Sequence, residues 1–256
     1  MPPGSNASAV KRYARPPIVE AVINVHVIYS DGLSEATIQA IEDHFSPQFT
    51  HCLRMEGLDV NLGAHPTDEV ATTRSVVGLR FANEENNRIL QIRSEGFAYS
   101  HLTPYSTWEE LRSEAEPLWF NFISICKPAR VSRLAVKFIN RLSIPSSSEM
   151  GVQLEDFLTF RPHVPPEFEQ LTGFMTQVQL PFPELAGNTP QALVTVASQP
   201  PTVPRTEAVV LDIDVFEGLD WATDDSRIWS ELERMRAVKN RIFEAALTDK
   251  IKDTFL

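Results

Sequence analysis

The sequence has little of what marks several common protein classes. It holds two cysteines, Cys52 and Cys126, in 256 residues, which is too few for a disulfide framework or a CxxC metal pair. Its six histidines show no HxH or HExxH spacing, so we expect no zinc site. The GxSxG, GxxxxGK[ST] and GxGxxG motifs are missing, which removes the commonest signatures of hydrolases, nucleotide-hydrolysing enzymes and dinucleotide-binding proteins.

Long apolar runs and an excess of basic residues are missing as well. No stretch approaches the ~18 to 20 apolar residues that cross a bilayer, and the first residues hold no apolar segment for export. We therefore predict a cytoplasmic protein without membrane contact, beginning with a flexible tail over residues 1–12. Because the net charge is −11, nucleic acid is disfavoured as a partner.

What the chain does contain is a series of well-patterned strands and helices. Alternating apolar residues predict strands at 18–29, 51–62, 73–82, 88–100, 130–144, 168–180, 191–198 and 207–217. Helical spacing of apolar residues predicts helices after Ser34, after Thr107 and at 225–247, and a short one at 154–160. Ser34 is the expected N-cap of the first of these helices, because its hydroxyl can accept a hydrogen bond from a free helical N–H group. At the start of the second helix, Thr107 with Glu110 and Ser106 with Glu109 both fit a capping box.

The two halves of the chain show a similar order of elements. Aligning Trp229 with Trp108 also aligns Leu232 with Leu111. We therefore predict an α+β fold of two β-α-β-β-β-α half-repeats, residues 13–128 and 129–256, in which a curved antiparallel sheet wraps two long helices. The halves would form one compact unit or two closely packed lobes. Each half resembles the unit of TATA-binding-protein-like and helix-grip folds in element order, which carries no function with it.

Three motifs point together to a family. They are RPPIVEAVI at 15–23, SHLTPYSTWEEL at 100–111 and LDIDVF at 211–216. They resemble an uncharacterised, sporadically distributed family of bacterial proteins of about this length. The resemblance implies a defence or mobile-element accessory factor, and it supplies no catalytic residues and no cofactor.

Asp212 and Asp214 form the most distinctive polar motif of the sequence. Two carboxylates at i and i+2 of a strand point to the same side and could share a divalent metal. Paired aspartates on a strand hold catalytic magnesium in nucleotide-transferring enzymes, so a metal-dependent nucleotide-acting enzyme is one hypothesis. The phosphate-binding loop that such enzymes place upstream is missing here.

A second interpretation treats the same aspartates as members of a charged sheet face. The strand at 130–144 places cations opposite its apolar residues, and these can pair with the aspartates across the sheet. The alternation of the other strands adds three residues to the same side. The candidate ligand-binding residues are Glu20, His26, Arg93, Arg133, Lys137, Arg141, Asp212 and Asp214.

The sequence as a whole favours a non-enzymatic binding protein over an enzyme. A well-patterned core without an intact catalytic signature suggests that the sheet, or the seam between halves, binds another protein or a small ligand. No cofactor is expected, and a homodimer stays open. The alternatives are the metal-dependent enzyme using Asp212 and Asp214, and a nucleic-acid-binding protein with a saddle-like sheet. We predict that His101 is a hydrogen-bonded turn residue rather than a catalytic base.

Overall fold

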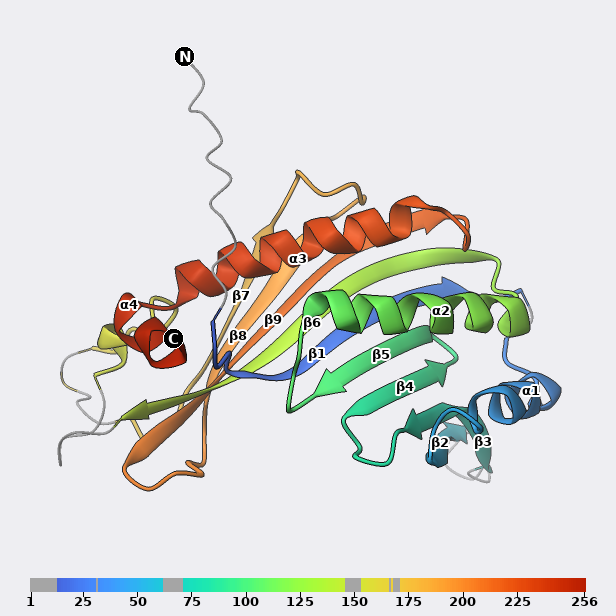
Figure 1. Ribbon diagram of the computed structural model, residues 1–256, viewed down its shortest axis with the longest axis horizontal. Coiled ribbons are helices and arrows are strands. Elements are labelled where there is room, and N and C mark those ends of the chain that lie inside the picture. Colours follow the sequence, from blue (N-terminus) through green and yellow to red (C-terminus); the bar gives the residue numbers. More distant parts are fainter. Residues whose placement is uncertain (1–12, 31, 62–70, 146–152, 166, 168–170) are drawn as a thin grey trace, which may run out of the picture.

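The computed structural model describes residues 13–30, 32–61, 71–145, 153–165, 167 and 171–256. They form an α+β structure in which one antiparallel sheet of nine strands carries helices on one side (Figure 1). Every strand pairs with its neighbours in the antiparallel sense. The sheet is therefore continuous from one end of the molecule to the other.

Nine strands, four helices and two 3-10 turns follow one another along the described part of the chain. The strands are β1 (Ile18–Ile28), β2 (His51–Asn61), β3 (Ala71–Ala82), β4 (Arg88–Arg93), β5 (Gly96–Leu102), β6 (Arg130–Pro145), β7 (Met175–Pro181), β8 (Gln191–Gln199) and β9 (Thr206–Trp221). The helices are α1 (Glu35–Phe45), α2 (Trp108–Cys126), α3 (Arg227–Ala246) and α4 (Asp249–Lys252), with 3-10 turns η1 (Leu154–Asp156) and η2 (Asp253–Phe255). The order across the sheet is β2-β3-β4-β5-β1-β6-β9-β8-β7.

The helices begin where the sequence predicts that they do. Thr107 Oγ1 accepts a hydrogen bond from the backbone N–H of Glu110 (3.1 Å), and Ser34 Oγ accepts one from the N–H of Thr37 (3.1 Å). Each bond satisfies an N–H that has no partner inside its helix. Ser34 is confirmed as the N-cap of α1, and of the two candidates at the start of α2 the cap is Thr107 and not Ser106.

Three helices pack against the same face of the sheet. On that face, Phe81 of β3 contacts Phe45 of α1, with ring centroids 5.7 Å apart. Phe97 of β5 contacts Trp119 of α2 at 5.7 Å, and the Lys239 ammonium of α3 lies 3.9 Å from the Phe138 ring centroid of β6. These strand residues belong to one set of cross-strand rows, so the hydrophobic core lies between this face and the helices.

The opposite side of the sheet is covered by no helix in the part of the chain that the structure describes, and we call it the open face. Because side chains alternate along a strand, it receives the residues that point away from the core. At its centre these are Glu20, Val22, Asn24 and His26 of β1; Arg133, Ala135, Lys137, Ile139 and Arg141 of β6; and Asp212, Asp214 and Phe216 of β9. Most of these side chains are half-buried, because they lie against one another.

The predicted class, α+β, agrees with the structure, but the predicted arrangement of the sheet and helices is wrong. We expected two β-α-β-β-β-α half-repeats whose curved antiparallel sheet wraps two long helices. The structure has instead one large sheet of nine strands, and the four helices described span 11, 19, 20 and 4 residues. β1 and β6, from the two predicted halves, pair directly, so the helices lie on one side of a shared sheet.

Two local features account for the error. The segment 88–100 was predicted as one strand, but it folds into the hairpin of β4 and β5, which adds a strand to the first half. Gly96 permits this turn, because its φ of 141° is disfavoured for other residues. In the second half the predicted helix at 154–160 reduces to the three-residue turn η1. The halves therefore have different element orders.

None of the helices in the described ranges is long and apolar enough to cross a membrane. The end of the chain, after the short helix α4, contacts the first residues that the structure describes. The Arg15 N–H donates to the carbonyl of Phe255 (2.9 Å), and the rings of Tyr13 and Phe255 meet edge to face at 5.7 Å. This contact closes the core beside the last turns of α3.

Candidate functional site

The centre of the open face holds a cross-strand ion-pair network. Lys137 Nζ lies 2.9 Å from Asp212 Oδ2, and an Arg133 terminal nitrogen lies 3.3 Å from Asp214 Oδ2. The Arg133 guanidinium also stacks 4.6 Å from the centroid of the Phe216 ring. The side chains of the two aspartates are only 24% and 21% exposed, so the pairs are screened less than a surface pair would be.

Three polar atoms of this face have no hydrogen-bond partner. They are Asp212 Oδ1, Asp214 Oδ1 and Arg141 Nε, each buried and unsatisfied by any described residue. Burial raises the pKa of Asp214, while the charges of Arg133 and Lys137 act in the opposite direction. Buried carboxylate oxygens and guanidinium N–H groups in folded proteins normally have a hydrogen-bond partner, so these three atoms are the ones on this face that a partner can contact.

The other predicted residues surround this centre. His26 stands directly opposite Arg133, and its pKa is lowered by burial and then by the Arg133 charge. Arg93 belongs to the same cross-strand row, separated from His26 by Gly96. Glu20 belongs to the row of Asp212, with Ile139 between them.

Arg141 lies further along β6, where its side chain donates to the carbonyl of Pro200 (2.7 Å). All the predicted site residues thus share one face, but the charged network joins only four of them, namely Arg133, Lys137, Asp212 and Asp214.

The aspartate pair has few of the features of a metal centre. Among the described residues, no group of three or more His, Cys, Asp or Glu side chains is placed to hold a metal ion. One oxygen of each aspartate already faces a cation. A metal would have to use the two remaining oxygens and tolerate Lys137 and Arg133 beside it. The metal-dependent hypothesis therefore stays a prediction that the geometry does not favour.

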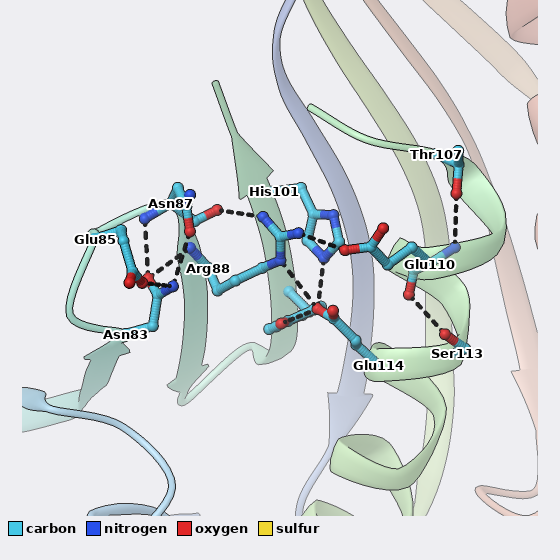
Figure 2. Close-up of polar contacts among 10 residues, drawn as sticks. Asn83, Glu85, Asn87, Arg88, His101, Thr107, Glu110, Ser113 and Glu114 are labelled. Atoms are coloured by element: carbon cyan, nitrogen blue, oxygen red, sulfur yellow. Dashed lines mark hydrogen bonds and ion pairs between the residues drawn. The ribbon is translucent and has the colours of Figure 1, made fainter. Parts of the chain in front are cut away.

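A second polar cluster lies on the helix side, between the β4–β5 hairpin and α2 (Figure 2). Glu114 Oε2 receives three partners: the Tyr99 hydroxyl at 2.7 Å, His101 Nε2 at 2.7 Å and Arg88 Nε at 3.1 Å. Arg88 also donates to Glu110 Oε1 at 2.7 Å. Figure 2 shows the Arg88 and His101 side chains pointing from the sheet toward these two glutamates of α2.

This cluster fixes the helix to the sheet and is poorly placed for catalysis. His101 is fully buried within β5, rather than in the predicted turn, and its Nδ1 has no partner among the described residues. Burial lowers the pKa of His101, which favours a neutral ring. Because Nδ1 is closed off from solvent, a substrate cannot reach the nitrogen that would act as a base.

A cavity of about 450 Å³ separates the middle of α2 from the beginning of α3. Sequence reasoning did not find it, because its walls come from α2, the segment before α3 and the first turns of α3, whose relative positions depend on the packing of distant segments. Its lining residues are Arg112, Glu116, Trp119, Phe120, Thr223, Asp224, Asp225, Ser226, Trp229, Ser230 and Glu233.

Sequence reasoning also missed two groups of buried charge. Glu217 and Glu231 are 0% and 3% exposed and face each other between β9 and α3, and Lys239 is 7% exposed above Phe138. In both cases the sequence contains a pattern that indicates burial of the charged residue. Glu217 continues the apolar alternation of Leu211 to Val215, and Lys239 stands on the apolar stripe of its helix.

Comparison with models of known protein families and with curated proteins found no match. The resemblance to a sporadically distributed bacterial family therefore stays a prediction from the sequence motifs.

Proposed function

We propose that this protein is a non-enzymatic binding protein whose partner, another protein, lies on the open face of the sheet. The observation that carries the proposal is the set of buried polar atoms left without partners there: Asp212 Oδ1, Asp214 Oδ1 and Arg141 Nε. Such atoms are rare in folded proteins, since each one forfeits a hydrogen bond that water would supply. A partner that covers these atoms and forms a hydrogen bond with each of them binds more tightly for every bond formed.

The chemistry of the unsatisfied atoms selects the partner. Two of the three are carboxylate oxygens, which need hydrogen-bond donors, and the third is a guanidinium N–H, which needs an acceptor. A protein surface offers both through its backbone amides, carboxamides and hydroxyls. The phosphates of a nucleic acid are acceptors only, so they leave both aspartates unsatisfied and add charge repulsion.

The surrounding network sets the orientation of the binding atoms. Lys137 and Arg133 hold the Oδ2 atoms at 2.9 and 3.3 Å, so each Oδ1 is fixed on a rigid strand. A preorganised polar surface loses little side-chain entropy when a partner arrives. The same pairs limit the net charge of the face, which favours a neutral polar partner over a strongly charged one.

The test compares matched isosteric variants of one strand. A partner is first captured from the native host with the wild-type chain and identified, and its affinity is then measured by calorimetry with purified components. We expect Asp212→Asn with Asp214→Asn to weaken binding about 10-fold or more, because an amide oxygen accepts less strongly than a carboxylate. Asp220→Asn makes the same change in an exposed part of β9 outside the network and should bind like the wild type.

Three results would overturn the proposal. They are the lack of any stoichiometric protein partner, a partner whose affinity is unaffected in the double variant, and Mg²⁺- or Mn²⁺-dependent turnover of a nucleotide that the double variant loses. The last outcome would establish the metal-dependent enzyme instead. Urea denaturation of each variant shows whether it is folded before binding is compared.

A further inference from the structure

The strand β7 lies at one edge of the sheet, and part of its backbone points away from β8. At the start of the pair, the N–H of Ser198 donates to the carbonyl of Phe174 at 2.9 Å, in register with the ladder of the two strands. In an antiparallel pair the residues bonded to the neighbour alternate, so the even-numbered residues of β7 bond to β8. Three residues with a free N–H and C=O therefore point out of the sheet. They are Met175, Gln177 and Gln179.

These outward backbone groups have no hydrogen-bond partner in the part of the chain that the structure describes. Their own side chains do not cover them. The Gln177 carboxamide donates to Thr195 Oγ1 at 2.9 Å and that of Gln179 donates to Gln191, so both side chains lie back across β8. An open edge of this kind is a template on which another strand can pair.

The other edge of the sheet, β2, carries the devices that prevent such pairing. Its ladder is interrupted by a register shift between Met55 and Glu56. Arg54 forms ion pairs with Glu35 and Glu42 of α1 at 2.7 and 2.6 Å, which hold that helix beside the strand. Bulges, charged side chains and a neighbouring helix are the means by which proteins block an edge. β7 has a regular register with β8 and no charged side chain.

The hairpin of β7 and β8 is almost free of charge. Residues 171–204 contain one charged side chain, Glu184, although charged residues make up 22% of the chain. Arg241 neutralises it at 2.7 Å. Because the net charge is −11, two copies repel each other over most of their surface but meet no like charge at this hairpin. Three apolar side chains of the edge are only half-buried against the core. They are Phe174, Val178 and Leu180.

We propose that β7 pairs antiparallel with β7 of a second copy of this chain, about a twofold axis at Gln177, so that two nine-stranded sheets become one. In this register Met175 faces Gln179 of the second copy, and every outward N–H meets a carbonyl. Pro181, which has no N–H, lies beyond these paired residues. Phe174 lies beside Leu180 of the second copy, so the half-buried apolar row of each edge is covered by the other.

A second copy fits this edge better than a charged segment of another protein, because it matches β7 in length, in lack of charge and in its apolar row. Pairing of an identical patch with itself also closes after two copies. The interface uses the edge of the sheet, so the open face stays available to the proposed protein partner, and the two proposals can fail separately.

Sedimentation velocity of the full-length chain over about a 100-fold range of concentration tests the proposal. We expect the wild type to become a dimer as concentration rises. Gln177→Lys and Gln177→Glu each place like charges opposite one another at the axis, so each should weaken dimerisation about 10-fold or more. An equimolar mixture of these two variants should recover the dimer, because unlike charges then face each other. Gln48→Lys, at an exposed residue after α1, should dimerise like the wild type.

Four results would overturn the inference. They are a wild type that stays monomeric at every concentration, a dimer that Gln177→Lys does not weaken, a mixture of the two variants that stays monomeric, and species larger than a dimer. The first is also the result expected if a different protein occupies this edge. Gln177 is exposed, so its substitution leaves the core intact, and circular dichroism establishes that each variant is folded.

Discussion

The buried acid pair between β9 and α3 predicts a specific dependence of stability on pH. Glu217 Oε2 accepts from the backbone N–H of Gly187, and Glu231 Oε1 accepts from that of Ala186 at 3.0 Å. Burial raises the pKa of Glu217 to about 7, helped by the charge and hydrogen bond of Glu231 and opposed by the Gly187 N–H and by Arg234. Glu217 is therefore protonated in the folded protein at mildly acidic pH, and together the two glutamates hold the loop before β8.

The size of the effect follows from linkage. A carboxyl whose folded pKa of about 7 exceeds its ordinary value of 4.5 stabilises the fold fully below pH 4.5 and loses this contribution as pH rises through 7. At about 1.4 kcal/mol per pKa unit, the loss between these limits is about 3 kcal/mol. Glu217→Gln stays neutral at every pH, so its free energy of unfolding should lack this component.

Urea denaturation of wild type and Glu217→Gln at pH 5 and pH 8 measures the difference. We expect the variant to lose about 2.5 kcal/mol less than the wild type between the two pH values, because part of the contribution is already lost at pH 5. Titrating groups away from the acid pair, His26 and His101 included, cancel in this comparison because both proteins contain them in the same surroundings. Glu155→Gln, which is exposed, should follow the wild type. Parallel pH profiles for wild type and Glu217→Gln would refute the protonated acid pair.

Four further substitutions, the last of them a control, test other parts of the structure by urea denaturation. Lys239→Met should stabilise the protein by roughly 1 to 3 kcal/mol at pH 6, because burial lowers the pKa of Lys239 to about 7. The gain in stability should shrink as pH rises toward 10, and a loss of stability at pH 6 would contradict this prediction. Glu114→Gln should cost about 2 kcal/mol, because Arg88, Tyr99 and His101 lose their shared charged acceptor, and a change below about 0.5 kcal/mol would argue against the role of the cluster. Gly96→Ala should cost at least about 3 kcal/mol, because its φ is 141° and its Cβ would lie 2.2 Å from the Val25 carbonyl. Gly32→Ala, with φ of 71° and open space around it, should cost only about 1 kcal/mol, so equal losses at the two glycines would be inconsistent with the crowded turn.

Much of the secondary structure could be predicted because local patterns determine it. Regular alternation gave β1, β6 and β9 close to their observed bounds, and the hydroxyls of Ser34 and Thr107 marked where α1 and α2 begin. The arrangement of the strands could not be predicted in this way. Whether β1 pairs with β6 is decided by contacts between segments that are distant in the sequence. The hairpin at Gly96 depends on a backbone angle, which the pattern of apolar residues does not indicate.

The charged cross-strand row of β6 and β9 was easier to predict than the order of the strands in the sheet. The alternation of Arg133, Lys137, Asp212 and Asp214 requires only that β6 and β9 be strands and neighbours, and the structure makes them so. Which cation pairs with which aspartate depends on side-chain reach, since Arg133 bypasses its direct neighbour Gly218 to contact Asp214. The cavity between α2 and α3 depends on the separation of two helices, which no single segment encodes.

Site-specific photocrosslinking in the native host tests the central claim most directly. A photoreactive amino acid at Ile139, which stands opposite Asp212 on the open face, reports what covers that face. The same group at Ala40, exposed on α1, samples the helix side of the molecule. We predict a discrete protein adduct from position 139 that is lost when Asp212→Asn and Asp214→Asn are added, and none from position 40. Adducts from position 40 alone, or none from 139, would contradict a binding role for the open face.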